Sequence, residues 1–404
     1  MTEEVVHLRY LLRPQEEANR PEFEVLSVYR DHGVIPKASR DDNFNKTPLD
    51  LTRYQVVKPG DLVINKMKAW QGSLGVSSYE GIVSPDYLVC TVDSRVYGPF
   101  LHYLLRSKPL IAEYGARSKG IRPAQWRLYW EDLADIKVTL PVSAEQRRIA
   151  EFLDAEVARI DRLALLHGRV VDRVVERERA FLDLEIDRLS ARYGCLPFRR
   201  FILRVEQGVS PQCDNVEAVG GEWGVLKVSA VKGGQFHSGE NKRLPDDLYP
   251  EHRFEVRDGD LLVTRANTPL LVGAVTVARN PRAQLLLCDK IFRVEVTSGL
   301  DKEFLSQMAA GSRVRALCGA ASHGTSQSMA NLKVGEIKEW PIPAVPLEEQ
   351  RRVVGMMRES QARAAELRLA IERQLELLEE RKRALVTAAV TGQMDVTTAR
   401  GFRE

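Results

Sequence analysis

Two short polar segments of the sequence carry side chains that are suited to reading the edges of DNA bases. Each follows a Gly-Asp-Leu turn and an apolar run, one at residues 65–71 and the other at residues 264–268. Arginine matches the two acceptors that guanine presents in the major groove, and asparagine or glutamine matches adenine. The candidates are Lys66, Lys68, Gln71, Arg265 and Asn267. The alternative is that both segments are ordinary hairpin loops with solvated side chains.

A second candidate surface is the basic stretch at residues 106–127, which has only Glu113 as an acid. Basic side chains among small residues suit contacts to phosphates, which position a protein on a duplex without reading its sequence. The candidates there are Arg117, Lys119 and Arg122. The corresponding stretch of the second half is less basic, and its candidates for phosphates or base edges are His323, Ser326 and Gln327. A solvated basic face is the alternative.

Sequence motifs of familiar enzymes are missing from the chain. It has no Gly-rich phosphate loop followed by Lys-Ser/Thr, no Asn/Asp-Pro-Pro-Tyr segment of adenine methyltransferases, no HExxH and no GxSxG. The paired carboxylates at 41–42 and 246–247 fall in polar, loop-like sequence and are read as solvated. These absences favour a binding protein over an enzyme, with neither a cofactor nor a metal in this chain.

Composition sets further bounds on the protein class. A chain of 404 residues is too long for a single hydrophobic core and suggests more than one folding unit. Because the net charge is only +3, any affinity for DNA must come from local basic surface. Five cysteines without a CxxC pair argue against a zinc site and against a disulfide framework, and fit a reducing cytosol. Neither a signal peptide nor an apolar run of membrane-spanning length is found. We therefore expect a cytoplasmic protein without membrane association.

The turns that precede the candidate loops belong to an internal duplication. Gly60-Asp-Leu recurs as Gly259-Asp-Leu, a shift of 199 residues, and the sequence around Asp86 resembles that around Asp289. The run Glu-Gln-Arg-Arg begins at residue 145 and again at residue 349, a shift of 204 residues. These matching segments occur in the same order in both halves of the chain. They indicate an internal duplication, and small insertions account for the different shifts.

Each copy divides into a globular part and a long helix. Short alternating runs with Gly and Pro turns predict mixed α+β domains at residues 1–140 and 193–342. Segments 141–192 and 343–404 begin with a proline and then carry helical periodicity, and each predicted helix is about 45 residues long, or roughly 65–70 Å. Ser143 and Gln146 fit a capping box at the start of the first helix.

Both predicted helices carry an apolar stripe with heptad spacing over about five heptads. Its members in the first helix are Ile149, Leu153, Ile160, Leu163 and Val174. In the second they are Val353, Met357, Leu367, Ile371, Leu378 and Leu385. Packing the two helices together within one chain would bury both stripes, and homodimerisation through them is the rival. We interpret His167 as a seam residue, and Arg177 and Arg381 as seam-edge residues whose matched placement could also serve a partner protein.

The sequence resembles the specificity subunits of type I restriction-modification systems over almost its whole length. The resemblance is carried by Leu140-Pro-Val-Ser-Ala-Glu-Gln-Arg-Arg-Ile149 and by Pro343-Ala-Val-Pro-Leu-Glu-Glu-Gln-Arg-Arg-Val353. The ending Ala384-Leu-Val-Thr-Ala-Ala-Val-Thr-Gly-Gln-Met-Asp395 and the segment Gly259-Asp-Leu-Leu-Val-Thr-Arg-Ala-Asn267 are also similar to that family.

This resemblance implies two target-recognition domains, separated by two long antiparallel coiled-coil helices in a pseudo-twofold internal repeat. It implies a non-catalytic subunit that recognises a bipartite site on double-stranded DNA, with the unread spacer set by the helices. The implied partners are two methyltransferase subunits, docked on the helices, and restriction or motor subunits; S-adenosylmethionine, ATP and Mg²⁺ are expected on those partners. A coiled-coil scaffold without DNA binding, and an enzyme with an unfamiliar site, are the alternatives.

Overall fold

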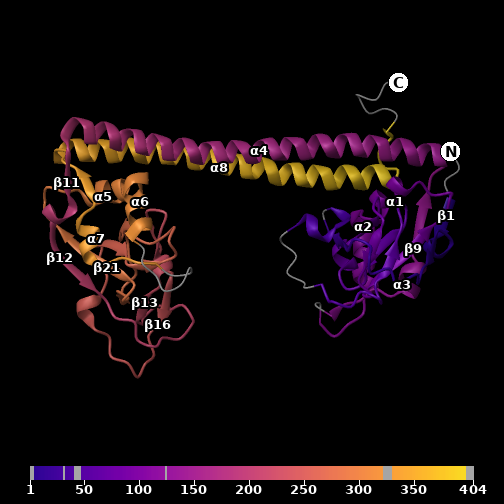
Figure 1. Ribbon diagram of the computed structural model, residues 1–404, viewed down its shortest axis with the longest axis horizontal. Helices are drawn as coiled ribbons and strands as arrows, with labels where there is room; N and C mark the ends of the chain where they lie inside the picture. The colour runs from indigo at the N-terminus through magenta and orange to yellow at the C-terminus, as the bar shows by residue number, and fades with distance from the viewer. Residues whose placement is uncertain (1–3, 31, 41–46, 123–124, 322–329, 397–404) are drawn as a thin grey trace. The chain divides into compact units, whose positions relative to one another are not determined.

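The computed structural model describes residues 4–30, 32–40, 47–122, 125–321 and 330–396. It divides into two compact units (Figure 1). Unit 1 comprises residues 1–168 and 372–404, and unit 2 comprises residues 169–371. The division falls inside two long helices, α4 (Ser143–Tyr193) and α8 (Leu347–Val390), so each unit contains one globular part and the adjoining portion of both helices.

The globular part of unit 1 is built on an antiparallel sheet in the order β2-β9-β6-β7. Its apolar core also contains side chains from the helices that follow the sheet and from the start of α4. The elements are β1 (Glu4–His7), β2 (Leu12–Pro14), β3 (Leu26–Tyr29), β4 (Gly33–Pro36), β5 (Gln55–Val57), β6 (Leu62–Asn65), β7 (Leu74–Val76), β8 (Gly81–Val83), β9 (Tyr87–Val92), α1 (Gly98–Leu105), α2 (Lys108–Arg117), α3 (Trp130–Ala134) and β10 (Lys137–Leu140).

The globular part of unit 2 is built on an antiparallel sheet in the order β12-β21-β17-β19. A smaller sheet, β16-β13-β20, covers part of it with a second apolar cluster. The elements are β11 (Cys195–Pro197), β12 (Ile202–Gln207), β13 (Gly224–Leu226), β14 (Val231–Lys232), β15 (Gln235–Phe236), β16 (Asn241–Arg243), β17 (Leu261–Thr264), β18 (Ala266–Asn267), β19 (Val275–Val277), β20 (Leu285–Leu286), β21 (Ile291–Val296), α5 (Lys302–Ala310), α6 (Ser312–Ala321), β22 (Ala330–Asn331), α7 (Val334–Lys338) and β23 (Pro341–Pro343).

The two units repeat one plan, as the duplicated sequence predicts. A terminal strand pair, β1 with β10 or β11 with β23, precedes the long helix in each unit. The Gly-Asp turn is also built alike, because Gly60 and Gly259 adopt φ values of 96° and 82°, which glycine tolerates best. The side chain of Asp61 accepts a hydrogen bond from the amide of Lys58 at 2.8 Å, and Asp260 accepts one from Arg257 at 2.9 Å. The predicted mixed fold with an internal repeat is confirmed.

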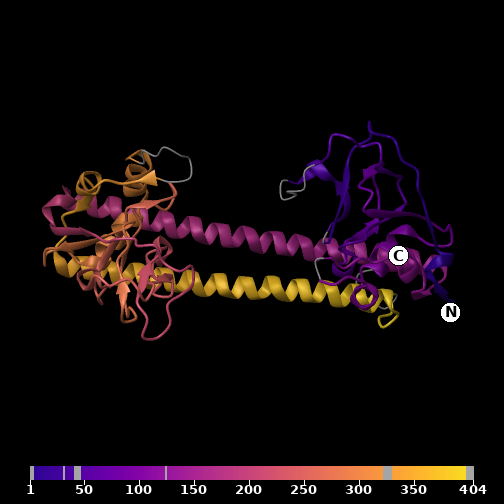
Figure 2. The same ribbon diagram turned by 90° about the horizontal axis from the view of Figure 1, so that it is seen from below.

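Helices α4 and α8 run side by side within each unit (Figures 1 and 2). In unit 1 the ammonium of Lys382 lies 2.6 Å from Asp161, and in unit 2 the guanidinium of Arg368 lies 3.9 Å from Glu178. Residue numbers on α8 fall from the first pair to the second while those on α4 rise, so the helices are antiparallel. The pairing is within the chain, as the intramolecular interpretation predicts, so homodimerisation is not needed to cover the stripes. No helix in the described part of the chain combines enough length and apolar character to cross a bilayer.

The stripe residues differ in how far the two helices cover them. Ile149, Leu153, Ile160, Val353, Met357 and Ile371 are buried. Val174, Leu378 and Leu385 are partly buried, as is His167, while Arg177 and Arg381 are exposed. Leu163 and Leu367 are 40% and 46% exposed. A two-helix seam is covered from one side only, so full burial occurs mainly where a globular part also packs on it.

A glutamine at the start of each long helix anchors it to the globular part of its own unit. The Gln146 side chain is 1% exposed; it accepts a hydrogen bond from the amide of Tyr97, which caps α1, and donates to the carbonyls of Pro141 and Arg95. The predicted capping box is therefore wrong, because the side-chain oxygen of Gln146 accepts from the amide of Tyr97 and not from the first amide of the helix. Gln350 repeats the pattern: it accepts from the amide of Asp301, the cap of α5, and donates to the carbonyls of Gly299 and Val345.

Candidate nucleic-acid interface

In unit 1 the fold brings together the two stretches in which DNA contacts are predicted. The loop after β6 is closed by Asn65, whose side chain accepts from the amide of Met67 at 3.1 Å. The amide of Leu128 donates to the carbonyl of Lys66 at 2.9 Å, and the ring of Trp70 meets that of Trp126 edge-on with centroids 5.4 Å apart. Loop 65–71 and the end of the basic stretch therefore form one surface.

The charges on this surface are partly neutralised and partly open. The ammonium of Lys66 donates to the carbonyl of Pro85 at 3.0 Å, and burial together with the nearby Arg127 guanidinium lowers the pKa of Lys66. Lys119 pairs with Asp132 at 2.8 Å, and Arg117 with Glu113 at 2.9 Å. Exposed pairs of this kind contribute about 0–1 kcal/mol. A phosphate could therefore compete for these cations at little cost.

Lys68, Gln71 and Arg122 are exposed on the same part of unit 1. Among the residues that the structure describes, neither Lys68 nor Arg122 has an ion-pair partner within 4.0 Å. Unpaired cations are the ones that gain most from a phosphate, because no existing interaction has to be broken.

In unit 2 the equivalent loop is held in the same way but presents different side chains. The amide of Leu332 donates to the carbonyl of Arg265 at 2.8 Å, as that of Leu128 does to Lys66 in unit 1. The partly buried Arg265 reaches the carbonyl of Asp289 at 3.4 Å, and Asn267 accepts from the amide of Thr268 at 2.8 Å. Lys66 and Arg265 therefore occupy equivalent positions. The other predicted contacts of this half, His323, Ser326 and Gln327, lie outside the described residues.

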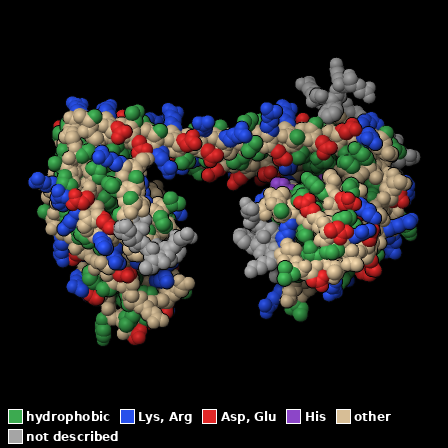
Figure 3. Space-filling view, in the orientation of Figure 1, with side chains coloured by type: hydrophobic (Ala, Val, Ile, Leu, Met, Phe, Trp, Pro, Cys, Tyr) green, Lys and Arg blue, Asp and Glu red, His purple; other side chains and the backbone are tan. Residues whose placement is uncertain are grey.

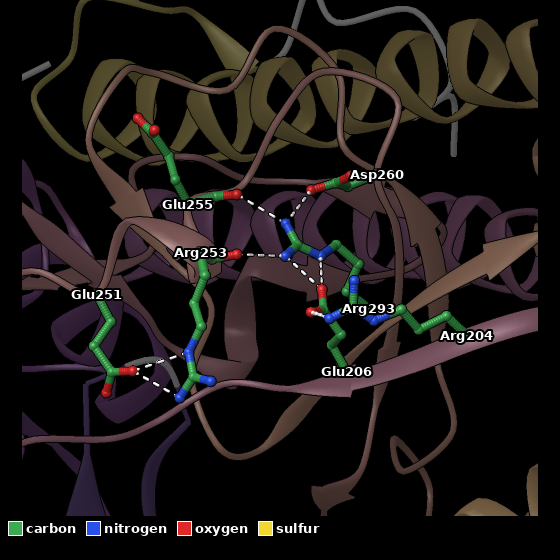
Figure 4. Close-up of polar contacts among 7 residues, drawn as sticks. All are labelled: Arg204, Glu206, Glu251, Arg253, Glu255, Asp260 and Arg293. Atoms are coloured by element: carbon green, nitrogen blue, oxygen red, sulfur yellow. Dashed lines mark hydrogen bonds and ion pairs between the residues drawn. The ribbon is translucent and has the colours of Figure 1, made fainter.

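A cluster of charged side chains, which was not predicted from the sequence, joins the main sheet of unit 2 to the Gly-Asp turn at the start of β17 (Figure 4). Arg293, on β21, is 11% exposed and lies 2.6 Å from Glu206 and 3.1 Å from Asp260. It also donates to the carbonyls of Glu255 and Arg253 at 2.8 and 2.7 Å. Burial acts to lower the pKa of Arg293, but the two carboxylates outweigh it and raise the pKa. Arg293 thus joins β12, the Gly-Asp turn and segment 251–255.

No broad basic face accompanies these local sites in the view of Figure 3. Lysines and arginines are interspersed with acids over the surface shown, including the long helices. The net charge of +3 is consistent with this distribution. DNA affinity would therefore depend on the loops and their immediate surroundings, as the composition predicts.

Two curated proteins of Escherichia coli are similar in sequence to this chain, although no family model matches it. The specificity subunit of the type I restriction enzyme EcoEI is 30% identical over 155 residues, which is 38% of this chain and 26% of that protein. The specificity subunit of EcoKI, from strain K12, is 23% identical over 375 residues, covering 84% of this chain and 76% of that protein. The match to EcoEI thus spans about a quarter of its subunit.

Solved structures show the same fold. A structure described as the basis of complex assembly and conformational transition of the type I restriction-modification system superposes with a TM-score of 0.70 at 15% identity, over 97% of this chain and 98% of that one. The HsdS subunit from Thermoanaerobacter tengcongensis gives a TM-score of 0.54 at 16% identity, over 97% of each chain. The resemblance expected from the helix starts is confirmed, and the scaffold alternative gains no support from these comparisons.

Proposed function

We propose that this chain, a homologue of the type I restriction specificity subunits, binds double-stranded DNA and reads a bipartite site with one loop surface in each unit. The observation that carries this proposal is the pair of equivalent loops after β6 and β17. Both are closed by the same backbone bond, yet one presents Lys66, Lys68 and Gln71 and the other Arg265 and Asn267. Similar frameworks with unlike side chains suit two unlike half-sites.

In this proposal the chain is a targeting subunit that has no catalytic activity of its own and acts in the cytoplasm. Methyltransferase subunits would supply S-adenosylmethionine chemistry, and restriction or motor subunits would use ATP and Mg²⁺. Exposed apolar side chains on the long helices support docking of such partners, because a bound partner would remove this apolar surface from water. They are Leu163, Leu165, Leu166, Val170, Val175 and Leu184 on α4, and Leu367, Leu369 and Leu377 on α8. The spacing of half-sites by helix length stays a prediction.

Binding through two surfaces predicts how the affinity for a full site compares with the affinity for each half-site. Once one half-site is bound, the second contact is intramolecular, so a full site binds far more tightly than either half alone. Co-expression with neighbouring methyltransferase subunits and genome-wide mapping of methylated adenines would identify the site. A gel-shift titration at fixed salt then compares the full site with each half-site. Equal affinities for all three duplexes would contradict the proposal.

Single substitutions in the loops should alter one half-site only. Arg265→Ala removes a side chain that can make a bidentate contact to guanine, which is worth about 1–3 kcal/mol of discrimination. We expect the methylated sequences to become degenerate within one half and to stay unchanged in the other. Lys66→Ala, at the equivalent position of unit 1, is the matched test and should affect the opposite half. Degeneracy in both halves from one substitution would show that the loops do not read separately.

A further inference from the structure

Unit 2 contains a basic pocket that lies beside its candidate reading loop. The pocket has a volume of about 390 Å³. That lies within the roughly 300–1,000 Å³ of small-ligand sites. Its lining comes from segment 210–213, from β13 and the residues after it, from Lys242 on β16, and from Cys288 and Lys290 before β21. The carbonyl of Lys290 accepts hydrogen bonds from the amides of Arg265 and Ala266, at 2.8 and 3.3 Å. The pocket wall and the reading loop are therefore continuous.

Three lysines line this pocket, and none of them is among the contacts predicted from the sequence. Lys227, Lys242 and Lys290 are these residues, and each is partly buried. In the described part of the chain none of the three ammonium groups has a carboxylate within 4.0 Å. An anion bound in the pocket would therefore meet cations that have no carboxylate partner to give up.

The acids around the pocket already have partners. Asp289 accepts a hydrogen bond from the hydroxyl of Ser210, and Asp214 lies 2.6 Å from Arg243. Glu240 accepts from the hydroxyl of Ser229 at 2.6 Å. None of these three carboxylates lies within ion-pairing distance of the three ammonium groups, so an anion in the pocket would not have to displace them.

The wall made by segment 208–213 is held firmly against the strand region opposite it. The amide of Val209 donates to the carbonyl of Leu287 at 3.2 Å, and the amide of Asp289 donates to Ser210 Oγ at 3.2 Å. The backbone approach is so close that a Cβ atom on Gly208 would lie 1.8 Å from the Leu287 carbonyl oxygen. The pocket is thus formed by the folded chain itself, and glycine is required at that position.

The rest of the lining selects among anions. Val225, Leu226 and Cys288 make a buried apolar floor, while Ser210 and Gln212 are exposed at the rim and can form hydrogen bonds. An inorganic anion would use only the lysines. A phosphate that carries a sugar would also cover the apolar floor, and duplex DNA presents such groups at every step of its backbone.

We propose that this pocket binds a sugar-phosphate of the DNA backbone flanking the half-site that unit 2 reads. The inference rests on the proposed function and adds a surface to it. Lys227, Lys242 and Lys290 neutralise the phosphate, and the neighbouring Arg265 loop is thereby set in register with the bases. The pocket contributes affinity that is independent of sequence, while the loop contributes specificity.

The test measures DNA affinity of the full chain, in the complex that co-purifies with it, over a series of salt concentrations. Each phosphate that the protein neutralises contributes about 0.9 to the slope of log K against log salt, so one phosphate held by all three lysines accounts for about 0.9 in total. We expect Lys227→Ala, Lys242→Ala and Lys290→Ala each to reduce this slope, and the triple variant to reduce it most. Lys338→Ala, an exposed lysine on α7 of the same unit, is the matched control and should leave the slope unchanged.

A second measurement needs no substitution and so does not depend on the stability of variants. Acetylation of the wild-type chain followed by mass spectrometry should show Lys227, Lys242 and Lys290 protected by the duplex, with Lys338 modified equally with and without it. Protection of all three by a free deoxymononucleotide, as strong as that by the duplex, would overturn the assignment to the DNA backbone. An unchanged slope in the triple variant, with wild-type affinity for the full site, would overturn the pocket but leave the proposed function intact. Loss of site preference in the wild-type complex would instead contradict the proposed function.

Discussion

The two units place different residues at one equivalent position of their main sheets. Val89 on β9 lies opposite Val63, and Arg293 on β21 lies opposite Leu262, at the same distance from the Gly-Asp turn. In unit 1 Val89 is fully buried among apolar side chains. In unit 2 Arg293 is held by two carboxylates and two carbonyls. The same backbone framework therefore tolerates an apolar or an ionic layer at this place.

The neighbours of this position change together with it. Gln15 in unit 1 donates to Asp61 at 3.0 Å, and Glu206 occupies the equivalent place beside Arg293 in unit 2. A neutral amide next to an aspartate requires no cation, whereas two carboxylates close together do. The residues at this place in the sheet therefore depend on one another, and changing one of them alone should lower the stability of the unit.

The largest loss of stability is expected when Arg293 alone is replaced. Arg293→Val leaves Asp260 without a cation, and leaves Glu206 with only the exposed Arg204, in a largely buried site. Removing one partner of a buried ion pair typically costs about 3–5 kcal/mol. Hydrogen exchange followed by mass spectrometry should show protection lost in peptides from β17 and β21, with peptides from β6 and β9 unchanged. The double variant Glu206→Gln with Arg293→Val reproduces the arrangement of unit 1 and should recover much of the loss. A double variant as unstable as the single one would show that the position is not specified as a group.

The glutamine anchors should give a smaller effect that is equal in both units. Gln146→Ala and Gln350→Ala each remove a buried amide and leave backbone groups unpaired, at about 1–3 kcal/mol for an unsatisfied group. Denaturant unfolding of the two variants measures this cost, and Gln361→Ala, at an exposed contact on α8, serves as the control. Markedly unequal costs would mean that the matching hydrogen bonds do not reflect matching roles.

Acid should destabilise unit 1 more than unit 2 through His102. Burial, with the Arg106 guanidinium beside the ring, lowers the pKa of His102 to about 3. The unfolded chain binds a proton near the ordinary value while the folded chain does not, so stability is lost as the pH falls below about 6.5, by about 1.4 kcal/mol per pH unit at most. The equivalent residue on α5 is Ser306, whose hydroxyl donates to the carbonyl of Val275 at 2.9 Å and does not titrate in this range.

Hydrogen exchange at a series of pH values, corrected for intrinsic exchange rates, separates the two units. Peptides of unit 1 should lose protection toward acid, and His102→Ser should reduce this dependence because it installs the residue of unit 2. The pH slope is compared and not the absolute stability, since the smaller side chain leaves a cavity. The same slope in the variant as in the wild type would exclude His102 as its source.

Much of the fold follows from the sequence because its signals are local or repeated. The Gly60 and Gly259 turns and the heptad stripes predict turns and long helices from residues close together in the chain. The repeated Glu-Gln-Arg-Arg helix starts predict an internal duplication because the same short run occurs twice. The neighbourhood of loop 65–71 and the basic stretch around Arg127 could not be predicted, because only the packed fold brings the amide of Leu128 to the carbonyl of Lys66.

The amino-acid sequence was enough to predict two copies of one domain, each followed by a long helix, and to show that the two candidate loops carry unlike side chains. The tertiary structure alone decided what the repeated Gln146 and Gln350 do, how Arg293 is neutralised, and which lysines of unit 2 share a pocket. The physical reason is the separation along the chain over which each signal acts. Helical periodicity and turns depend on a few neighbouring residues, whereas hydrogen bonds and ion pairs between strands join groups that lie tens of residues apart. The duplication of the glutamines was a signal of their importance, but their partners are visible only in three dimensions.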